Sequence, residues 1–309
     1  MSVIRSSTTH VIRSARNRWA DLRIATRSPG SSETGPLPDF LIVGAMKTGT
    51  TSLSGNLKLH PRIYMTRREV RFFDQNWHQG LDWYRTFFRE GAGKVCGEKT
   101  PEYMRVRRYM ERIRHVVPSA KIIVLLREPV ARLMSEINHR MHGGTLPAAD
   151  LIDAGYIRKF VLADPVRGRR MLDRGFYLKQ IRENVLSCFP RDQVLIHGTD
   201  ESARAIQRDL LRAGRIAGQL TGDDDTAHTA KALNEICAFL EIEPFTGSEP
   251  FTFSGVRVHH ATVTHEARKM IYDRYAEQNR RLFDLLGRDF PDWREEVAVG
   301  DRTGKTEQP

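Results

Sequence analysis

The stretch FLIVGAMKTGTTS, from Phe40 to Ser52, decides the fold class of this chain. It opens with a short, continuous apolar run that Gly44 closes, the pattern of a strand buried on both faces of a parallel sheet. A helical pattern over 50–59 begins immediately after the turn. A buried strand that leads directly into a helix predicts the first half of an α/β unit.

The turn between this strand and its helix has the composition of a phosphate-binding loop. A helix N-terminus presents unpaired backbone N–H groups and a partial positive charge, both of which favour anions. Two glycines allow the backbone to approach phosphate oxygens, the hydroxyls over 50–52 add donors, and Lys47 supplies a full charge. We therefore predict a phosphate site rather than an ordinary strand-to-helix turn. Lys47 precedes the second glycine, Gly49, so the loop is neither a Walker A motif nor the GxGxxG of a dinucleotide fold.

A second buried strand, KIIVLL over 121–126, leads into an arginine-rich turn and helix. Arg127 stands at the end of this strand, and Ser135 lies in the helix predicted over 130–141. Arg132 and Ser135 are neighbours on one face of that helix. An arginine fork with a hydroxyl suits a phosphate monoester. A surface cluster of Arg and Glu explains the same residues equally well.

The remaining patterns continue the alternation of strands and helices. Weaker strand patterns lie over 94–97 and 193–197. Helical patterns cover 81–88, 106–116, 177–188, 230–240 and 266–286. This alternation predicts an α/β protein with a P-loop-like three-layer fold, in which helices flank a central, mainly parallel sheet.

The chain has 309 residues, 40% of them hydrophobic, which is enough for one large domain with a substantial core. We place this domain over 37–296, between a basic tail over 1–36 and a second tail over 297–309. The N-terminal tail is rich in Arg, Ser and Thr, which is typical of disorder and also of organellar presequences; we predict disorder. The segment over 199–229 carries mixed charge and an acidic run, and we predict a solvated surface insertion rather than a cation site.

The formal net charge of +11 favours anionic partners such as nucleotides, sulfated or carboxylated glycans, nucleic acid or acidic membranes. No apolar run approaches the roughly 20 residues that cross a bilayer, and the N-terminus lacks the apolar core of a signal peptide. Cys96, Cys188 and Cys237 have neither zinc nor disulfide spacing. We therefore expect a cytoplasmic protein with no membrane span and no metal site.

In combination, the two anion sites have a known counterpart. The strand, KTGTTS turn and helix, followed by KIIVLLREPVARLMS over 121–135, resemble the sulfotransferases that use 3′-phosphoadenosine-5′-phosphosulfate (PAPS). The likeness is to the branch that contains the heparan sulfate N- and 3-O-sulfotransferases and to its bacterial relatives. It extends in order over most of 38–293, through the motifs REVRFFD (68–74), GLDWY (80–84), EKTPEY (98–103) and LLGRDF (285–290).

The resemblance implies a role for each part of the two sites. The first loop would bind the 5′-phosphosulfate end of PAPS through Lys47, Thr48, Gly49, Thr50, Thr51 and Ser52. Arg127 and Ser135 would bind the 3′-phosphate, which distinguishes PAPS from ATP. Gly255-Val256-Arg257 looks like the late loop that this family closes over the nucleotide, with Arg257 on the 3′-phosphate.

The expected reaction moves a sulfuryl group in line from PAPS to a hydroxyl of a carbohydrate-like or small-molecule acceptor, leaving adenosine 3′,5′-bisphosphate. As in phosphoryl transfer, the protein positions the groups, stabilises charge and deprotonates the acceptor. The resemblance makes Glu69 the general base, with Lys47 and Lys99 neutralising the charge that grows on the oxygens. From the residues alone, Glu69 also fits an ion-paired surface glutamate. Arg71 stands where the glycosaminoglycan enzymes usually carry histidine, so a heparan-type acceptor is less strongly implied than sulfotransfer itself.

Two other functions use the same features. A small-molecule kinase with an atypical phosphate loop would share the fold, but it needs Gly-Lys-Ser/Thr and a carboxylate placed for Mg²⁺, and we find no convincing pair. A non-catalytic polyanion-binding protein would use the basic tail and the arginines over 105–114. Aromatic residues are sparse among those charges, so nucleic acid is not an expected partner.

Overall fold

The computed structural model describes residues 35–198, 223–245, 261–295 and 299. Most of the two predicted tails and most of the predicted insertion lie outside these residues, and so does the whole of the predicted late loop with Arg257. None of the described helices is long and apolar enough to cross a membrane.

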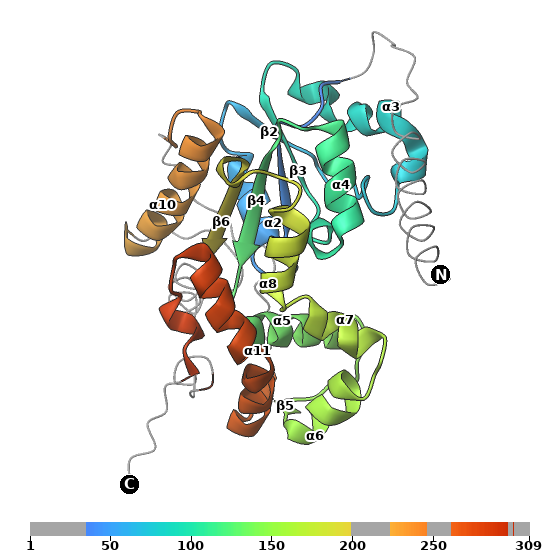
Figure 1. Cartoon of the computed structure of the whole chain (residues 1–309), viewed down its shortest axis with the longest axis vertical. Coiled ribbons are helices and arrows are strands. Elements are labelled where there is room, and N and C mark those ends of the chain that lie inside the picture. The colour runs from blue at the N-terminus through green and yellow to red at the C-terminus, as the bar shows by residue number, and fades with distance from the viewer. Residues whose placement is uncertain (1–34, 199–222, 246–260, 296–298, 300–309) are drawn as a thin grey trace, which may run out of the picture.

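Five parallel strands form the central sheet (Figure 1). They stand in the order β2-β3-β1-β4-β6. Their bounds are β1 (Phe40–Gly44), β2 (Ile63–Met65), β3 (Val95–Lys99), β4 (Lys121–Leu126) and β6 (Val194–Gly198). The predicted central parallel sheet is confirmed. Strand β2 was not predicted, because its three residues are too few to carry a pattern.

Helices connect the strands and cover the sheet. The longer ones are α2 (Thr50–Leu57), α4 (Arg107–Val116), α5 (Pro129–His142), α10 (Asp223–Leu240) and α11 (His265–Leu286). Shorter helical segments are α3 (Gly80–Arg85), α6 (Ala154–Ile157), α7 (Arg167–Asp173), α8 (Tyr177–Lys179), the π-helical η4 (Arg158–Leu162) and η5 (Gln180–Val185), and the 3₁₀ turns η1 (Trp77–Gln79), η2 (Thr86–Gly91), η3 (Tyr103–Arg105), η6 (Arg191–Gln193) and η7 (Pro291–Trp293). Helix α10 begins inside the segment that was predicted as an insertion, so that segment is not wholly irregular.

The two faces of the sheet pack against different helices. Leu41 and Val43 of β1 belong to an apolar cluster that also contains residues of α4 and η5. Phe40 and Ile42 belong to a second cluster, with residues of α2 and α10. Every residue of β1 is buried, which is why its sequence is apolar throughout instead of alternating. Helices on both faces of one sheet give the three layers that the sequence predicted.

Helix α5 begins as its sequence requires. Pro129 occupies the first turn, where a missing N–H leaves no hydrogen bond unmade. The buried carboxylate of Glu128 accepts hydrogen bonds from the backbone N–H groups of Val130 (2.6 Å) and Ala131 (2.7 Å). This cap fixes the turn after β4, and with it the position of Arg127 between strand and helix.

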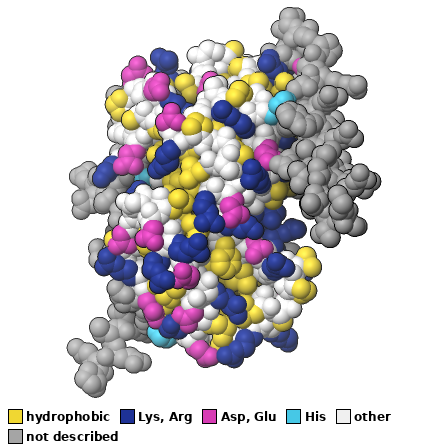
Figure 2. All heavy atoms as spheres, in the orientation of Figure 1, with side chains coloured by type: hydrophobic (Ala, Val, Ile, Leu, Met, Phe, Trp, Pro, Cys, Tyr) yellow, Lys and Arg dark blue, Asp and Glu magenta, His cyan; other side chains and the backbone are white. Residues whose placement is uncertain are grey.

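A smaller lobe, formed by α5, α6, α7 and α11, lies beyond the carboxyl ends of the strands. In Figure 1 the arrowheads of β4 and β6 point toward it. Its apolar cluster includes Leu133 of α5 together with Ile271 and Tyr275 of α11. A short parallel ladder of β5 (Leu151–Ile152) and β7 (Thr262–Val263) adds to the same cluster. Figure 2, in the orientation of Figure 1, shows Lys and Arg side chains mixed with Asp and Glu across the middle of the face turned to the viewer.

A buried network of ion pairs joins the smaller lobe to the sheet. Glu136 of α5 accepts hydrogen bonds from Arg132 (2.8 Å) and Arg174 (2.5 Å). Arg174 also contacts Glu102, which follows β3, at 3.2 Å. The sequence left open whether Arg132 faces a phosphate or a surface cluster. Its side chain is fully buried and paired with Glu136 one helical turn away, so it does neither.

Removal of Glu136 is expected to destabilise the fold strongly. Burial by itself raises the pKa of this carboxyl, but the charges of Arg132 and Arg174 outweigh burial and hold the pKa below its usual range. The network therefore stabilises the protein fully at pH values above the ordinary glutamate pKa. This contribution is lost as the pH falls through the lowered pKa of Glu136. We expect Glu136→Ala to lower the free energy of unfolding by about 3–5 kcal/mol at neutral pH, because the buried guanidinium of Arg132 loses its carboxylate and that of Arg174 loses one of its two.

Urea unfolding of the two proteins measures this difference, which should shrink as the pH is lowered. Glu90→Ala is the matched control, since its partner Arg67 has a side chain that is 81% exposed. An exposed pair of this kind contributes at most about 1 kcal/mol. Equal losses in the two variants would contradict a stabilising role for the buried network.

Candidate active site

Three cations that the sequence singled out lie at the carboxyl edge of the sheet. Strand β1 ends at Gly44 and continues into the loop that carries Lys47. Strand β3 ends at Lys99, and β4 ends at Leu126, directly before Arg127. Neighbouring parallel strands end at the same edge, so the strand order β3-β1-β4 brings the three cations to one edge of the sheet.

The loop after β1 has the geometry of an anion site. The N–H of Ala45 donates to the carbonyl of Leu125 in β4 (2.8 Å), and Oγ1 of Thr48 donates to the carbonyl of Ala45 (2.7 Å). Lys47 (φ 70°) and Gly49 (φ 90°) both have left-handed backbone conformations. The N-cap of α2 is Gly49, which has no side chain to cap the helix, and a Cβ added to it would meet nothing within 4 Å. An open helix N-terminus beside a lysine-bearing loop fits an anion.

Lys99 connects this loop to the predicted general base. Its Nζ lies 2.9 Å from Oε1 of Glu69 and 3.1 Å from Oγ1 of Thr51. Glu69 belongs to the segment after β2, and Thr51 to the first turn of α2, so three separate elements supply this cluster. The side chain of Lys99 is 13% exposed and that of Glu69 37% exposed. The cluster is therefore accessible from solvent while its cation is largely enclosed.

A cavity of about 190 Å³ opens beside the cluster. Thr51 and Lys99 line it together with Lys58, the residue after α2, and with Arg67 and Arg68 of the Glu69 segment. Four of these five side chains are cations. The lining therefore favours a ligand that carries negative charge or several hydroxyl groups next to the Glu69 carboxylate.

Arg127 lies against the phosphate loop. Its Nη1 is 3.5 Å from the carbonyl oxygen of Lys47, and its own carbonyl accepts a hydrogen bond from the hydroxyl of Tyr177 (3.0 Å). Tyr177 is fully buried at the start of α8, so it holds the backbone of Arg127 in place. Ser135 is half-buried in α5, and Arg257 lies outside the described residues. The structure thus brings Arg127 to the loop, and the roles of Arg127, Ser135 and Arg257 in nucleotide binding stay predictions.

Arg71 is paired with a carboxylate that the sequence analysis missed. Its Nε and Nη2 lie 3.0 Å and 2.6 Å from Oδ2 of Asp74, whose side chain is only 3% exposed. The spacing of these two residues in REVRFFD was the one local signal for the pair. The guanidinium is thereby oriented beside the Glu69 segment, and it keeps its charge at any pH at which the protein folds.

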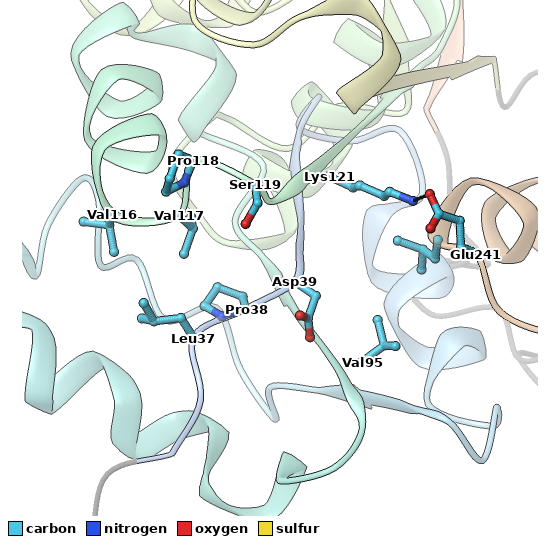
Figure 3. Close-up of a pocket in the computed structure, with 11 residues that line it drawn as sticks. Leu37, Pro38, Asp39, Val95, Val116, Val117, Pro118, Ser119, Lys121 and Glu241 are labelled. Atoms are coloured by element: carbon cyan, nitrogen blue, oxygen red, sulfur yellow. Dashed lines mark hydrogen bonds and ion pairs between the residues drawn. The ribbon is translucent and has the colours of Figure 1, made fainter.

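A larger cavity, of about 400 Å³, lies at the opposite edge of the sheet (Figure 3). Asp39 before β1, Val95 of β3 and Lys121 of β4 line it, and each stands at the amino end of its strand. The Nζ of Lys121 is held there by Glu241, 2.6 Å away. No predicted site residue lines this cavity, so the candidate active site is the smaller one at the carboxyl edge.

Comparison with known proteins agrees with this site. A family model described as a sulfotransferase domain matches residues 37–196, slightly more than half of the chain. The chain belongs to the sulfotransferase family. The matched region includes the loop with Lys47 and also Glu69, Lys99 and Arg127, and it confirms the family that the sequence motifs predicted.

This sulfotransferase has curated relatives among the heparan sulfate enzymes. It is 27% identical over 257 residues to the heparan sulfate glucosamine 3-O-sulfotransferase 3B1 of Mus musculus, an alignment that covers 82% of this chain and 64% of that protein. It is 41% identical over 100 residues to the heparan sulfate glucosamine 3-O-sulfotransferase 6 of Homo sapiens, covering 32% of this chain and 29% of that protein. The chain therefore spans slightly less than two thirds of the length of the mouse relative.

A solved structure with the same fold is the sulfotransferase from Alicyclobacillus acidocaldarius. It superposes with a TM-score of 0.61 at 24% sequence identity, over 84% of this chain and 99% of that one. The likeness confirms the predicted α/β fold with a parallel sheet between helices.

The left-handed conformation of Gly49 gives a direct test of the loop geometry. We expect Gly49→Ala to lower the free energy of unfolding by about 1 kcal/mol, since a Cβ is disfavoured at positive φ although the space is open. Gly49→Asn is the matched control, because asparagine tolerates this conformation better than alanine does. Urea unfolding measures both, and an alanine variant as stable as the wild type would show that the loop does not need this conformation.

Proposed function

We propose that this sulfotransferase moves a sulfuryl group from PAPS to a hydroxyl of a carbohydrate-like or small-molecule acceptor, with Glu69 as general base. The observation that carries the proposal is the position of Lys99, whose ammonium contacts both the Glu69 carboxylate (2.9 Å) and the Thr51 hydroxyl (3.1 Å). One cation thus stands between the group that would take a proton and the loop that would hold the donor.

Two features of the site support PAPS as the donor. The loop with Lys47 and Gly49 leads into the uncapped N-terminus of α2, which suits the 5′-phosphosulfate end. Arg127 contacts the Lys47 carbonyl and supplies a second cationic group next to the first, as a nucleotide with an additional 3′-phosphate requires. Ser135 and Arg257 complete this 3′-phosphate site in the proposal.

Each residue of the cluster has a separate role in the proposed reaction. Glu69 accepts the proton of the acceptor hydroxyl while the acceptor oxygen bonds to sulfur and the bond from sulfur to the 5′-phosphate oxygen breaks. Lys47 and Lys99 neutralise the charge that develops on the oxygens, and adenosine 3′,5′-bisphosphate is the leaving product. The ammonium of Lys99 is paired with the carboxylate of Glu69. Movement of the Lys99 ammonium to the oxygens of the donor would free the Glu69 carboxylate to act as a base.

The acceptor side of the proposal rests on chemistry and on the relatives' names. A carboxylate base suits a hydroxyl acceptor, and the relatives are named as 3-O-sulfotransferases of a glucosamine. The cationic lining of the small cavity, with Lys58, Arg67 and Arg68, favours a polar or anionic acceptor over an apolar one. Arg71 is held by Asp74 beside the base and adds to this preference.

Nucleotide specificity tests the donor half of the proposal. We expect the full chain to bind adenosine 3′,5′-bisphosphate more tightly than ATP in a calorimetric titration. Arg127→Ala should weaken the bisphosphate about 10- to 100-fold, because a charge-assisted contact is lost, and should leave ATP nearly unaffected. Arg114→Ala is the control, since this exposed arginine contacts Pro118 and Gln193 near the opposite edge of the sheet. Preference for ATP would overturn the assignment of PAPS.

Turnover tests the base. We expect Glu69→Gln to lower kcat about 10²- to 10⁴-fold, since the amide cannot take a proton, while the affinity for the bisphosphate stays within about threefold. The assay measures bisphosphate release from PAPS with heparan sulfate oligosaccharides and simple alcohols as acceptors. Glu241→Gln, which alters an exposed carboxylate paired with Lys121 at the opposite edge of the sheet, is the control. Full activity in Glu69→Gln would remove this residue from the mechanism.

A further inference from the structure

Glu98 is a fully buried carboxylate directly beside the site. It precedes Lys99 in β3, and successive residues of a strand face opposite sides, so Glu98 is turned inward where Lys99 is turned toward the site. Among the described residues no cation is paired with Glu98. A buried carboxylate without a cation has to be satisfied by hydrogen-bond donors, and here the donors are hydroxyl groups.

Three hydroxyls converge on this carboxylate. Tyr103 (2.7 Å) and Thr100 (2.8 Å) donate to Oε1, and Tyr84 donates to Oε2. Tyr84 comes from the GLDWY motif and the other two from EKTPEY, motifs to which the sequence analysis gave no role for these residues. Because each hydroxyl hydrogen is directed to Glu98, the lone pairs of each hydroxyl oxygen are available to accept a further hydrogen bond.

Two of these oxygens accept hydrogen bonds from the segment that carries Glu69. The backbone N–H of Arg71 donates to Oγ1 of Thr100 (3.4 Å), and the N–H of Phe73 donates to the hydroxyl oxygen of Tyr103 (3.3 Å). Tyr84 makes no such contact to this segment's backbone among the described hydrogen bonds. A continuous path of hydrogen bonds therefore leads from Glu98 to within two residues of the proposed base.

Packing reinforces the same attachment. The ring of Phe72 stacks on Tyr84 with 4.3 Å between centroids, and Phe73 meets Tyr103 edge-on at 5.5 Å. Arg71 is held at φ 55°, a conformation that residues other than glycine rarely adopt. A backbone in such a conformation persists only where its surroundings impose it, and the anchored N–H groups on Arg71 and Phe73 supply that constraint.

We propose that Glu98 is a positioning residue, which through Thr100 and Tyr103 fixes the Glu69 segment relative to Lys99 and so sets the separation of base and cation. The proposal rests on the proposed role of Glu69 in sulfuryl transfer. Glu98 and Lys99 are consecutive in one strand, so a loosened network displaces Glu69 while Lys99 stays in place. A displacement of about 1 Å in a reacting group can cost about 100-fold in rate.

Three single substitutions in the full chain separate positioning from stability. Thr100→Val and Tyr103→Phe each remove one donor to Glu98 and one acceptor of a backbone N–H. Tyr84→Phe removes a donor to the same carboxylate and leaves both backbone contacts intact. Bisphosphate release from PAPS with heparan sulfate oligosaccharides gives kcat and KM, calorimetry gives bisphosphate affinity, and urea unfolding gives stability.

We expect kcat to fall about 10- to 100-fold in Thr100→Val and Tyr103→Phe, with KM and bisphosphate affinity within about threefold, and to fall clearly less in Tyr84→Phe. Thr100→Ser, which keeps the hydroxyl, should restore most of the lost kcat. Losses of kcat that merely follow stability across the three variants, or unchanged kcat in both Thr100→Val and Tyr103→Phe, would overturn the proposal. Absence of turnover in the wild type would instead overturn the proposed function, and this inference with it.

Discussion

The parallel direction of the five strands is the constraint on which the rest of the structure depends. Strand β1 is buried on both faces and paired with β3 on one side and β4 on the other. Only the loops at its two ends can therefore reach solvent. At the carboxyl end the chain turns through the loop of Lys47 and directs the N-terminus of α2 toward that edge. The neighbouring strands deliver Lys99 and Arg127 to the same edge. The gathering of positive charge there follows from topology rather than from any single motif.

Two buried glutamates hold the fold around this edge, and they are satisfied in different ways. Burial by itself would raise the pKa of both carboxyls. At Glu136 the charges of Arg132 and Arg174 outweigh burial, so the ionised form is favoured and the smaller lobe is tied to the sheet by charge. At Glu98 the hydroxyls of Tyr84, Tyr103 and Thr100 offset burial only in part, so the pKa stays raised. The arginines at Glu136 supply charge, whereas the hydroxyl groups at Glu98 supply directional hydrogen bonds. Directional bonds suit a segment that has to hold the proposed base in one position.

In the proposed function, the residues around the site divide into a donor side and an acceptor side. The phosphate loop, Glu69 and Lys99 lie within the region that matches the family model. Arg71, at a position where the glycosaminoglycan enzymes usually carry histidine, is fixed by Asp74 and keeps its charge. Arg67 and Arg68 line the nearby cavity with Lys58 and Lys99, so the proposed acceptor side is cationic.

The sequence by itself determined the fold class, the strand-turn-helix around Lys47 and the place of Arg127. These features are local: the apolar runs over 40–43 and 121–126 and the residues that follow each run are contiguous in the chain. Only the tertiary structure decided that Lys99 bridges Glu69 and Thr51, that Arg132 is buried against Glu136, and that three hydroxyls from two motifs meet at Glu98. Such contacts depend on strand order and on which side chains face each other across elements, and no local periodicity encodes either of these.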